Sequence, residues 1–236
     1  VKVIMAKHGL PFVFPKKVQE ETENINQLVA MEEGRFDYRG RQLITIDGED
    51  AKDLDDAIDV VRLANGNFRL GVYIADVSYY VKPGTAIDEE AYARGTSVYL
   101  VDRVIPMLPA VLSNGICSLN AGKDRYAMTC VMEIDKNGKV IHADIGPAVI
   151  QVKRRCNYTE VRKALAEGIV PDDLCSFMPM LRNLRDLSQI LKDMRIRRGA
   201  IDFDFPEYKI ILDTEGKPLR LEKRERSIAE QMVEES

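Results

Sequence analysis

The chain has 236 residues, of which 45% are hydrophobic and 31% are charged, and its formal net charge is −4. That length can bury a sizeable core in one large domain or two small ones, and no apolar run approaches the roughly 20 residues of a membrane span. The cysteines form no CxxC pair, which argues against a zinc knuckle or a disulfide framework and favours a reducing compartment. We therefore expect a cytoplasmic globular protein without a membrane partner.

Strands are expected to dominate the first half. A Pro-broken lead-in over residues 1–40 ends in a segment, 17–31, with helix-like apolar spacing. Asn65-Gly66 is a strong hairpin signal, and Thr85 is a plausible N-cap for a short helix that stops near Gly95. Alternating apolar patterns predict strands at residues 41–46, 57–63, 67–77 and 96–101.

Helices are expected to take over in the second half. A hairpin of strands 125–134 and 140–152 precedes a helix that Thr159 could cap. A longer amphipathic helix spans residues near 179–198, and Ser227 caps a last short helix. A further hairpin, of strands 207–212 and 219–224, stands between these two helices. This order of elements predicts an α+β fold, with helices packed on a mixed, largely antiparallel sheet.

One stretch, "ITIDGEDAKDLDDAIDV" from Ile44 to Val60, holds six acidic residues in its first thirteen positions. It lies between two predicted strands, so the carboxylates are expected on a loop at the edge of the sheet. Crowded carboxylates are costly unless a cation neutralises them or water screens them. A solvated acidic loop is the common alternative to a metal site. The acidic residues are Asp47, Glu49, Asp50, Asp53, Asp55 and Asp56.

The side chains and their spacing favour a hard divalent cation. Asp53, Asp55 and Asp56 have short side chains that hold their oxygens where the backbone puts them. Mg²⁺ typically takes one or two carboxylates, waters and substrate phosphates. The spacing excludes an EF-hand, which needs acidic residues at alternating positions followed by Gly and Glu. Magnesium is the expected ion, with manganese as the alternative.

The pattern D47-x5-D53-x-D55-D56 resembles the catalytic signature of the ribonuclease II and ribonuclease R exoribonucleases, the RNB domain. Further blocks resemble that family in the same order, and the segment "DGEDAKD" is closer to the ribonuclease R branch. The blocks are "IADVSYYV", "IPMLPAVLSNGICSLNAGKDR", "RRGAIDFDFPE" and "RSIAEQMVEE". The resemblance implies residues 1–40 as a lead-in and 41–236 as an RNB-like catalytic domain that is incomplete at its C-terminus.

The resemblance implies Mg²⁺-dependent hydrolysis of RNA from the 3′ end, releasing nucleoside monophosphates. It implies Asp47 and Asp56 as direct metal ligands, with Asp53 and Asp55 completing the metal site. Asp55, with Asp53, is the expected catalytic residue, and Asp55 the one whose loss the chemistry tolerates least. Glu49 and Asp50 match no assigned position.

Single-stranded RNA is the partner that the resemblance implies. Tyr99 and Phe203 match family aromatics that stack on or clamp bases near the 3′ end; each is otherwise an ordinary sheet or core residue. Residues 151–200 hold eleven Lys/Arg and six Asp/Glu, a local charge of +5. Phosphate contacts are expected there, although a solvated surface with carboxylate pairs explains them as well. The basic candidates are Arg154, Arg155, Arg197 and Arg198.

Departures from the family limit these expectations. Tyr73 and Tyr79 stand where many members carry histidine. The cold-shock-like and S1 RNA-binding domains, and a catalytic arginine of the second half of the RNB domain, have no counterpart here. We therefore expect a fragment with little activity of its own, cut from a longer exoribonuclease that also contacts RNA-decay or ribosome-associated factors. The alternatives are a non-catalytic RNA-binding module that retains the fold, a metal-binding or interaction domain unrelated to RNA, and an endonuclease.

Overall fold

The computed structural model describes residues 2–201, 205, 207–224 and 226–236. The chain divides into two compact units, each made of several segments. The first comprises residues 1–28, 77–116 and 204–225, and the second comprises residues 29–76, 117–203 and 226–236. The fold is α+β with a largely antiparallel sheet, as the sequence predicted.

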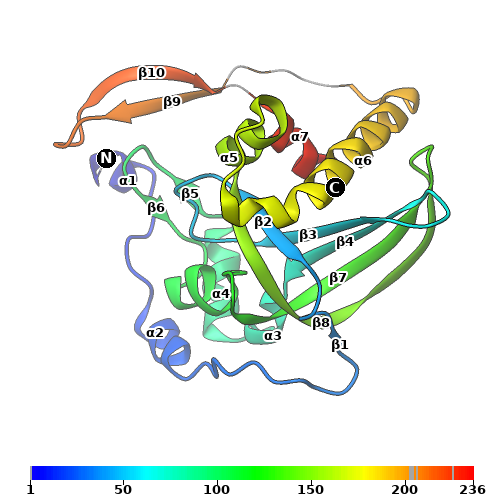
Figure 1. Cartoon of the computed structure of the whole chain (residues 1–236). Helices are drawn as coiled ribbons and strands as arrows, with labels where there is room; N and C mark the ends of the chain where they lie inside the picture. Colours follow the sequence, from blue (N-terminus) through cyan, green and yellow to red (C-terminus); the bar gives the residue numbers. More distant parts are fainter. Residues whose placement is uncertain (1, 202–204, 206, 225) are drawn as a thin grey trace. The chain divides into compact units, whose positions relative to one another are not determined.

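The second unit is built on a closed barrel of five strands (Figure 1). Antiparallel pairs join β2 to β3, β3 to β4, β4 to β7 and β7 to β8, and a parallel pair of β8 with β2 closes the ring. A short strand, β1, runs parallel to β8 beside it. The strands are β1 (Phe36–Asp37), β2 (Leu43–Asp47), β3 (Asp56–Arg62), β4 (Phe68–Ala75), β7 (Asp124–Ile134) and β8 (Val140–Asn157).

The length of β8 makes the closure possible. Its first part, from Val140 to Gln151, pairs with β7, and its last part, from Val152 to Asn157, pairs with β2. The strand predicted to end at residue 152 continues for five further residues. Because the last residue of β2, Asp47, pairs with Asn157, the end of β8 lies beside the start of the acidic turn.

A polar network lies buried between β3 and β4. The Tyr73 hydroxyl donates to Asp59 Oδ1 at 2.6 Å and accepts from Arg41 Nη1 at 2.7 Å, and Arg69 Nη2 donates to Asp59 Oδ2 at 3.0 Å. Asp59 is buried, and its charge is matched by the two arginines. Gly71, opposite Asp59, leaves the space that this network occupies, because a Cβ there would overlap Asp59 and Tyr73.

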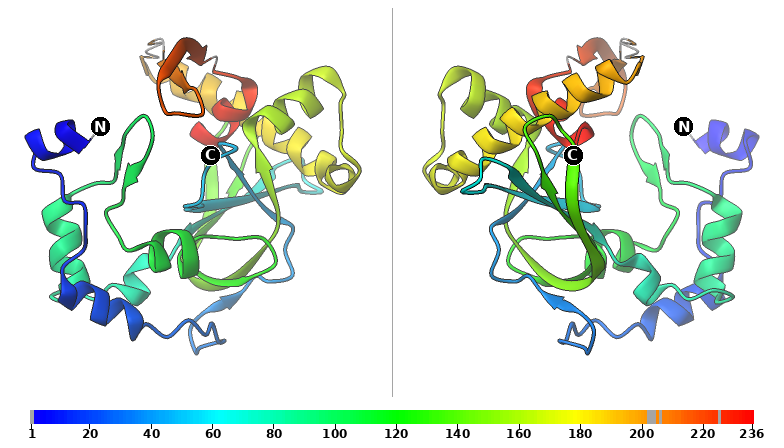
Figure 2. Two further views of the ribbon diagram at one scale, coloured as in Figure 1. Left: turned by 90° about the vertical axis from the view of Figure 1, so that its left-hand side faces the viewer. Right: turned by 90° about the vertical axis from the view of Figure 1, so that its right-hand side faces the viewer.

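Helices cover one side of this barrel (Figures 1 and 2). The long helix α6 (Met178–Arg197) packs on β3 and on α7 (Ile228–Glu234). Apolar side chains of β2, β3 and β4 form one core with the buried residues of these helices. Around them lie α5 (Tyr158–Arg162), the π-helical turn η2 (Lys163–Glu167) and the 3₁₀ helix η3 (Asp172–Phe177).

The first unit consists of short elements. Its helices are α1 (Lys2–Lys7), α2 (Lys16–Glu23), α3 (Val77–Tyr80), α4 (Ala86–Arg94) and the irregular π-helical segment η1 (Val111–Ile116). The helices α2 and α4 pack together, and Glu21 accepts the Ile87 amide at 3.2 Å. Its strands form two antiparallel pairs, β5 (Val98–Tyr99) with β6 (Val104–Ile105) and β9 (Glu207–Leu212) with β10 (Pro218–Arg224).

Several local predictions are confirmed and others are wrong. Thr85 caps α4 by accepting the Asp88 amide, and Ser227 caps α7 in a capping box with Glu230. Asn157, and not Thr159, caps α5, because the strand before it runs on to Asn157. The predicted helix over 17–31 ends at Glu23, and the strand predicted over 96–101 is limited to Val98–Tyr99.

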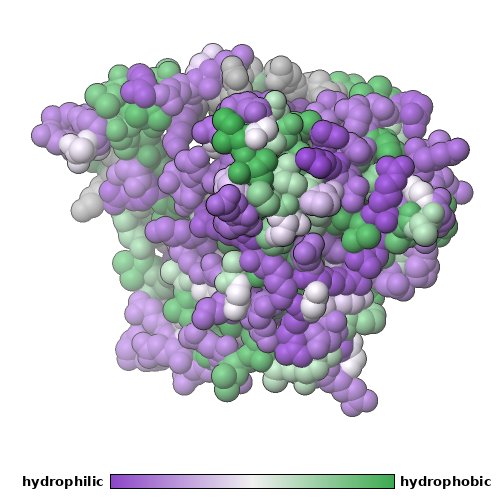
Figure 3. Space-filling view, viewed as in Figure 1, coloured by the Kyte–Doolittle hydropathy of each residue, from purple (hydrophilic) through white to green (hydrophobic). Residues whose placement is uncertain are grey.

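The face in Figure 3 is mainly hydrophilic, with hydrophobic side chains in scattered groups. None of the helices described here combines the length and the apolar character needed to cross a membrane.

Candidate active site

The acidic turn joins two neighbouring strands of the barrel. Asp47 is the last residue of β2 and Asp56 is the first residue of β3, and these strands pair antiparallel through Ile44 and Ile58. Because an antiparallel connection returns the chain to the same edge, the two carboxylates lie at one end of the barrel. Asp53 and Asp55 lie on the loop between them.

Ser118 holds the middle of this loop. The Leu54 amide donates to Ser118 Oγ at 3.1 Å, and this hydroxyl donates to the Lys52 carbonyl at 2.9 Å. The Leu119 amide donates to the Leu54 carbonyl at 2.8 Å, and the Leu54 side chain is buried. The segment that leads into β7 therefore fixes the backbone on both sides of Asp53.

Arg155 holds the start of the loop. Its Nη2 donates to the carbonyls of Gly48, Glu49 and Ala51, at 3.2, 3.0 and 2.7 Å. The side chain comes from β8, on the strand that pairs with β2. Together with Ser118, it makes the acidic turn an anchored loop.

Burial and mutual repulsion perturb the carboxylates. Burial raises the pKa of Asp47 to about 6, the negative charge of Asp56 adds to this rise, and the positive charge of Arg155 opposes it. The pKa of Asp55 is raised by desolvation and then by the charges of Asp53 and Asp56, although the residue is exposed at the surface. Burial also raises the pKa of Asp56. A cation would relieve all three shifts.

Asp47 carries a direct indication that a cation fits. Its Oδ2 is buried and has no hydrogen-bond partner among the described residues. A buried unpaired carboxylate oxygen is costly, and a hard cation that prefers oxygen ligands would satisfy it.

The four aspartates do not form a complete protein cage. In the part of the chain that the structure describes, no three His, Cys, Asp or Glu side chains are arranged to hold a metal by themselves. Mg²⁺ commonly binds through one or two carboxylates and completes its shell with water and substrate phosphates. A pair of these carboxylates offers the oxygen ligands that such an ion takes from a protein.

The other acidic residues of the turn are peripheral. Glu49 and Asp50 are exposed. Glu49 contributes its backbone carbonyl to Arg155. Cys117 lies near Asp55, and burial raises the pKa of its thiol to about 12, so it stays neutral and is a poor nucleophile.

The basic residues that the sequence proposed for RNA contact lie in different settings. Arg154 pairs with Glu160 at 2.5 Å and with Asp173 at 3.0 Å, which holds its guanidinium against α5 and η3. Arg197 and Arg198 are exposed at the end of α6, where Arg197 Nη2 donates to the Asn137 carbonyl at 3.2 Å. Their contact with RNA stays a prediction.

The aromatic candidates belong to other parts of the chain. Tyr99 is exposed on β5 of the first unit. Phe203 lies outside the described residues. Tyr73, one of the two departures from the family pattern, is buried in the network with Asp59 and Arg41. Tyr79, the other departure, packs edge-on against Tyr80, with 4.9 Å between the ring centroids.

Sequence reasoning missed Ser118 and the role of Arg155 in the turn. Ser118 belongs to the block "IPMLPAVLSNGICSLN", which looked irregular and offered no local motif. The sequence showed Arg155 only as one of three consecutive basic residues after a predicted strand, which indicated a positive charge but not its contact with the turn. The contacts of both residues depend on strands that meet far apart in sequence.

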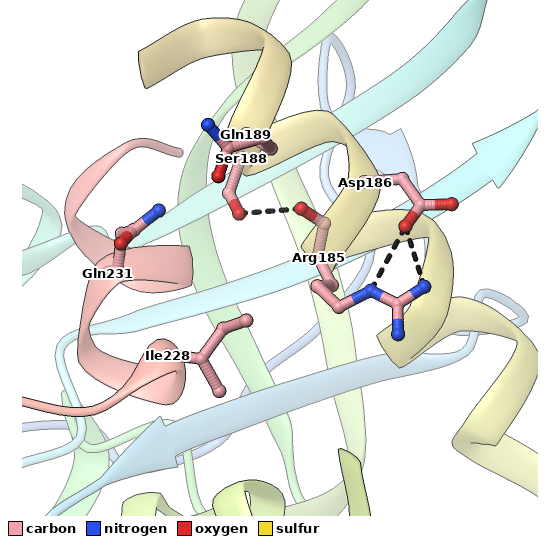
Figure 4. A pocket seen from close by; sticks show the side chains of 6 residues that line it. All are labelled: Arg185, Asp186, Ser188, Gln189, Ile228 and Gln231. Atoms are coloured by element: carbon pink, nitrogen blue, oxygen red, sulfur yellow. Dashed lines mark hydrogen bonds and ion pairs between the residues drawn. The ribbon is translucent and has the colours of Figure 1, made fainter. Parts of the chain in front are cut away.

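An open pocket of about 220 Å³ lies elsewhere in the second unit, between α6 and α7 (Figure 4). Arg185 pairs with Asp186 at its rim, and Ile228 and Gln231 face it from α7. None of the four aspartates lines it, so this pocket is separate from the carboxylate site.

The barrel and the carboxylate turn define the class of the protein. Residues 35–236 match the RNB domain, and the chain belongs to this family. Among curated proteins it is 48% identical to ribonuclease R of Thermotoga maritima over 98% of its length, and 39% identical to ribonuclease R of Escherichia coli over its whole length. The chain spans 33% and 29%, respectively, of the length of these two relatives.

Solved structures agree with this assignment. The fold matches Mycoplasma genitalium RNase R in complex with ribose-methylated single-stranded RNA with a TM-score of 0.92 and 32% identity, over 99% of this chain and 37% of that one. A yeast pseudonuclease shares the fold at a TM-score of 0.68 and 16% identity, over 89% of this chain and 26% of that one. Because a pseudonuclease has this fold, the fold alone does not establish catalysis. Catalysis must be inferred from the carboxylates of the site.

Proposed function

We propose that this chain forms the carboxylate-bearing part of a ribonuclease R-type exoribonuclease that degrades RNA from the 3′ end. The observation that carries the proposal is the cluster of Asp47, Asp53, Asp55 and Asp56 at one end of the barrel. Their pKa shifts and the unpartnered Oδ2 of Asp47 support a cation there. Membership of the RNB family supports RNA as the substrate class.

The cation in this proposal is Mg²⁺, with Mn²⁺ as a substitute. Asp47 and Asp56 would hold it directly, and Asp53 and Asp55 would complete the metal site. When bound at such a site, divalent cations activate a water and stabilise the leaving oxygen of a phosphodiester. The described residues contribute anchored carboxylates and a turn held by Ser118 and Arg155.

Single-stranded RNA is the proposed partner, since a related RNase R was solved in complex with it. Exposed arginines such as Arg197 and Arg198 are candidates for phosphate contact, and Tyr99 is a candidate for base stacking. Phosphate contacts carry no sequence preference, and they weaken as salt rises. The activity of the whole protein is part of the proposal because the chain spans about a third of the length of its curated relatives.

The test uses a protein of the relatives' full length that contains this chain. Asp55→Asn is expected to bind single-stranded RNA within about threefold of the wild-type affinity and to lose hydrolysis by about 100-fold or more, because an amide is a weaker ligand for a hard cation than a carboxylate and cannot accept a proton from the attacking water. Asp50→Asn, the matched control, removes a charge from the same turn at an exposed position. It is expected to keep nearly wild-type turnover.

Two measurements on the full-length protein separate the alternatives: the products of an end-labelled RNA, and RNA binding at increasing salt concentration. A 5′-labelled RNA should shorten stepwise from its 3′ end in the presence of Mg²⁺ and stay intact with a chelator. Internal cuts from the start would indicate an endonuclease, and salt-dependent binding without cleavage would indicate the non-catalytic RNA-binding module. Near-normal turnover of Asp55→Asn would overturn the assignment of that residue.

A further inference from the structure

Arg155 stands out because one nitrogen atom organises the backbone of the acidic turn. Nη2 lies within 3.2 Å of the carbonyl oxygens of Gly48, Glu49 and Ala51. This nitrogen has two hydrogens, so three acceptors share them around one positive centre. In the same turn the Ala51 amide donates to the Gly48 carbonyl at 3.2 Å, and Ser118 acts further on, at Lys52 and Leu54.

The place of Arg155 in the barrel connects it to Asp47. Arg155 pairs with Thr45 in the parallel register of β8 and β2, two residues before Asp47 on the same strand. Residues two apart on a strand share a face, so Thr45 and Asp47 share the face of β2 beside which Arg155 stands. The turn that Arg155 holds begins at Gly48, directly after Asp47. A shift of this turn would therefore move the Asp47 carboxylate.

We propose that Arg155 is a positioning residue of the carboxylate site, which holds the turn from Gly48 to Ala51 closed so that Asp47 presents its carboxylate to the cation. The proposal rests on the metal site of the proposed function and assigns Arg155 a task that precedes any contact with RNA. Three converging carbonyls and a row of carboxylates repel one another, and a guanidinium offsets this repulsion while donating hydrogen bonds. Lysine would supply a similar charge, but as a strongly hydrated ammonium on a flexible stem.

The neighbours of Arg155 provide matched controls. Lys153 lies two residues earlier on β8, is also exposed, and donates to Gln151 at 2.8 Å. Arg154 points to the other face and pairs with Glu160 and Asp173. Lys153→Gln therefore removes the same formal charge from the same strand, at a side chain that bonds to Gln151 and not to the turn.

The experiment compares Arg155→Gln, Arg155→Lys and Lys153→Gln in this chain without RNA. Mn²⁺ affinity is measured by electron paramagnetic resonance, and backbone hydrogen exchange is followed across residues 48–53. Supporting partners of metal ligands typically contribute 10–100-fold in affinity, so Arg155→Gln should weaken Mn²⁺ binding about 10-fold. It should also speed exchange at Ala51 several-fold. Arg155→Lys should fall in between, and Lys153→Gln should match the wild type.

Each outcome decides. If Arg155→Gln keeps both Mn²⁺ affinity and exchange within about twofold of the wild type, the positioning role is wrong, even if RNA affinity then drops. If Arg155→Gln unfolds, Arg155→Lys, whose side chain keeps the charge, decides by the same two readouts. If the wild type itself binds no Mn²⁺, the proposed metal site fails, and the exchange rate alone then decides whether Arg155 holds the turn.

Discussion

Asp47 makes folding depend on pH in the sense opposite to that of a salt-bridged carboxylate. Its pKa is about 6 in the folded chain and about 3.9 in an unfolded one. Between these values the folded state binds more protons than the unfolded state, so the free energy of unfolding falls as pH rises from about 4 to about 6. Asp55 and Asp56 contribute with the same sign, since their pKa values are also raised.

The variant Asp47→Asn should therefore be more stable than the wild type at neutral pH without metal, by on the order of 1 kcal/mol. The advantage should shrink as pH falls below the pKa of Asp47, because the wild-type carboxyl is then protonated. Urea unfolding in a chelator at about pH 4.5 and about pH 6.5 measures both values. Equal free energies of unfolding of the two proteins at both pH values would show that the buried Asp47 carboxylate does not destabilise the fold.

At the residue scale, the sequence indicated which side chains were special and not what surrounds them. The spacing of the four aspartates marked the carboxylate turn, because metal-binding residues must be of particular types at particular intervals. The unpartnered Oδ2 of Asp47 and the hydrogen bonds of Arg155 to the turn could not be predicted. Both depend on the pairing of β2 with β8, which lie more than 100 residues apart in the chain.

At the scale of elements, the start of α5 shows how a strand can displace a helix cap. Thr159 has the side chain of an N-cap, but Asn157 occupies the cap position, with its Oδ1 accepting the Glu160 amide at 2.8 Å. Asn157→Ala should therefore lower the free energy of unfolding by about 1 kcal/mol. Thr159→Ala should change it by less than about 0.5 kcal/mol. Chemical denaturation of the two variants decides, and the reverse order would contradict the assigned cap.

Local signals predicted the elements that close on themselves. The hairpin at Asn65-Gly66, the N-cap at Ser227 and the periodicity of α6 each lie within a few residues, and each is present. Patterns that extended past the real element were less informative. The apolar spacing after Glu23 is not helical in the structure, since residues 25–32 have no regular secondary structure.

At the scale of the molecule, closure of the barrel was beyond the sequence. Alternating patterns predict strands but not their partners, and the parallel pair of β8 with β2 connects strands separated by five others along the chain. This closure brings Arg155 and Asn157 to the end of β2, and so creates the supported turn. A mixed sheet in an α+β fold was predicted, but the closure of this sheet into a barrel was not.

The central claim is that the aspartate turn binds a divalent cation, and calorimetric titration of this chain with Mn²⁺ tests it most directly. The wild type is expected to bind weakly and with a measurable heat, and the double variant Asp47→Ala/Asp56→Ala is expected to show none. Glu49→Ala, which removes an exposed carboxylate from the same turn, is expected to resemble the wild type. Equal and negligible uptake by the wild type and the double variant would contradict the account.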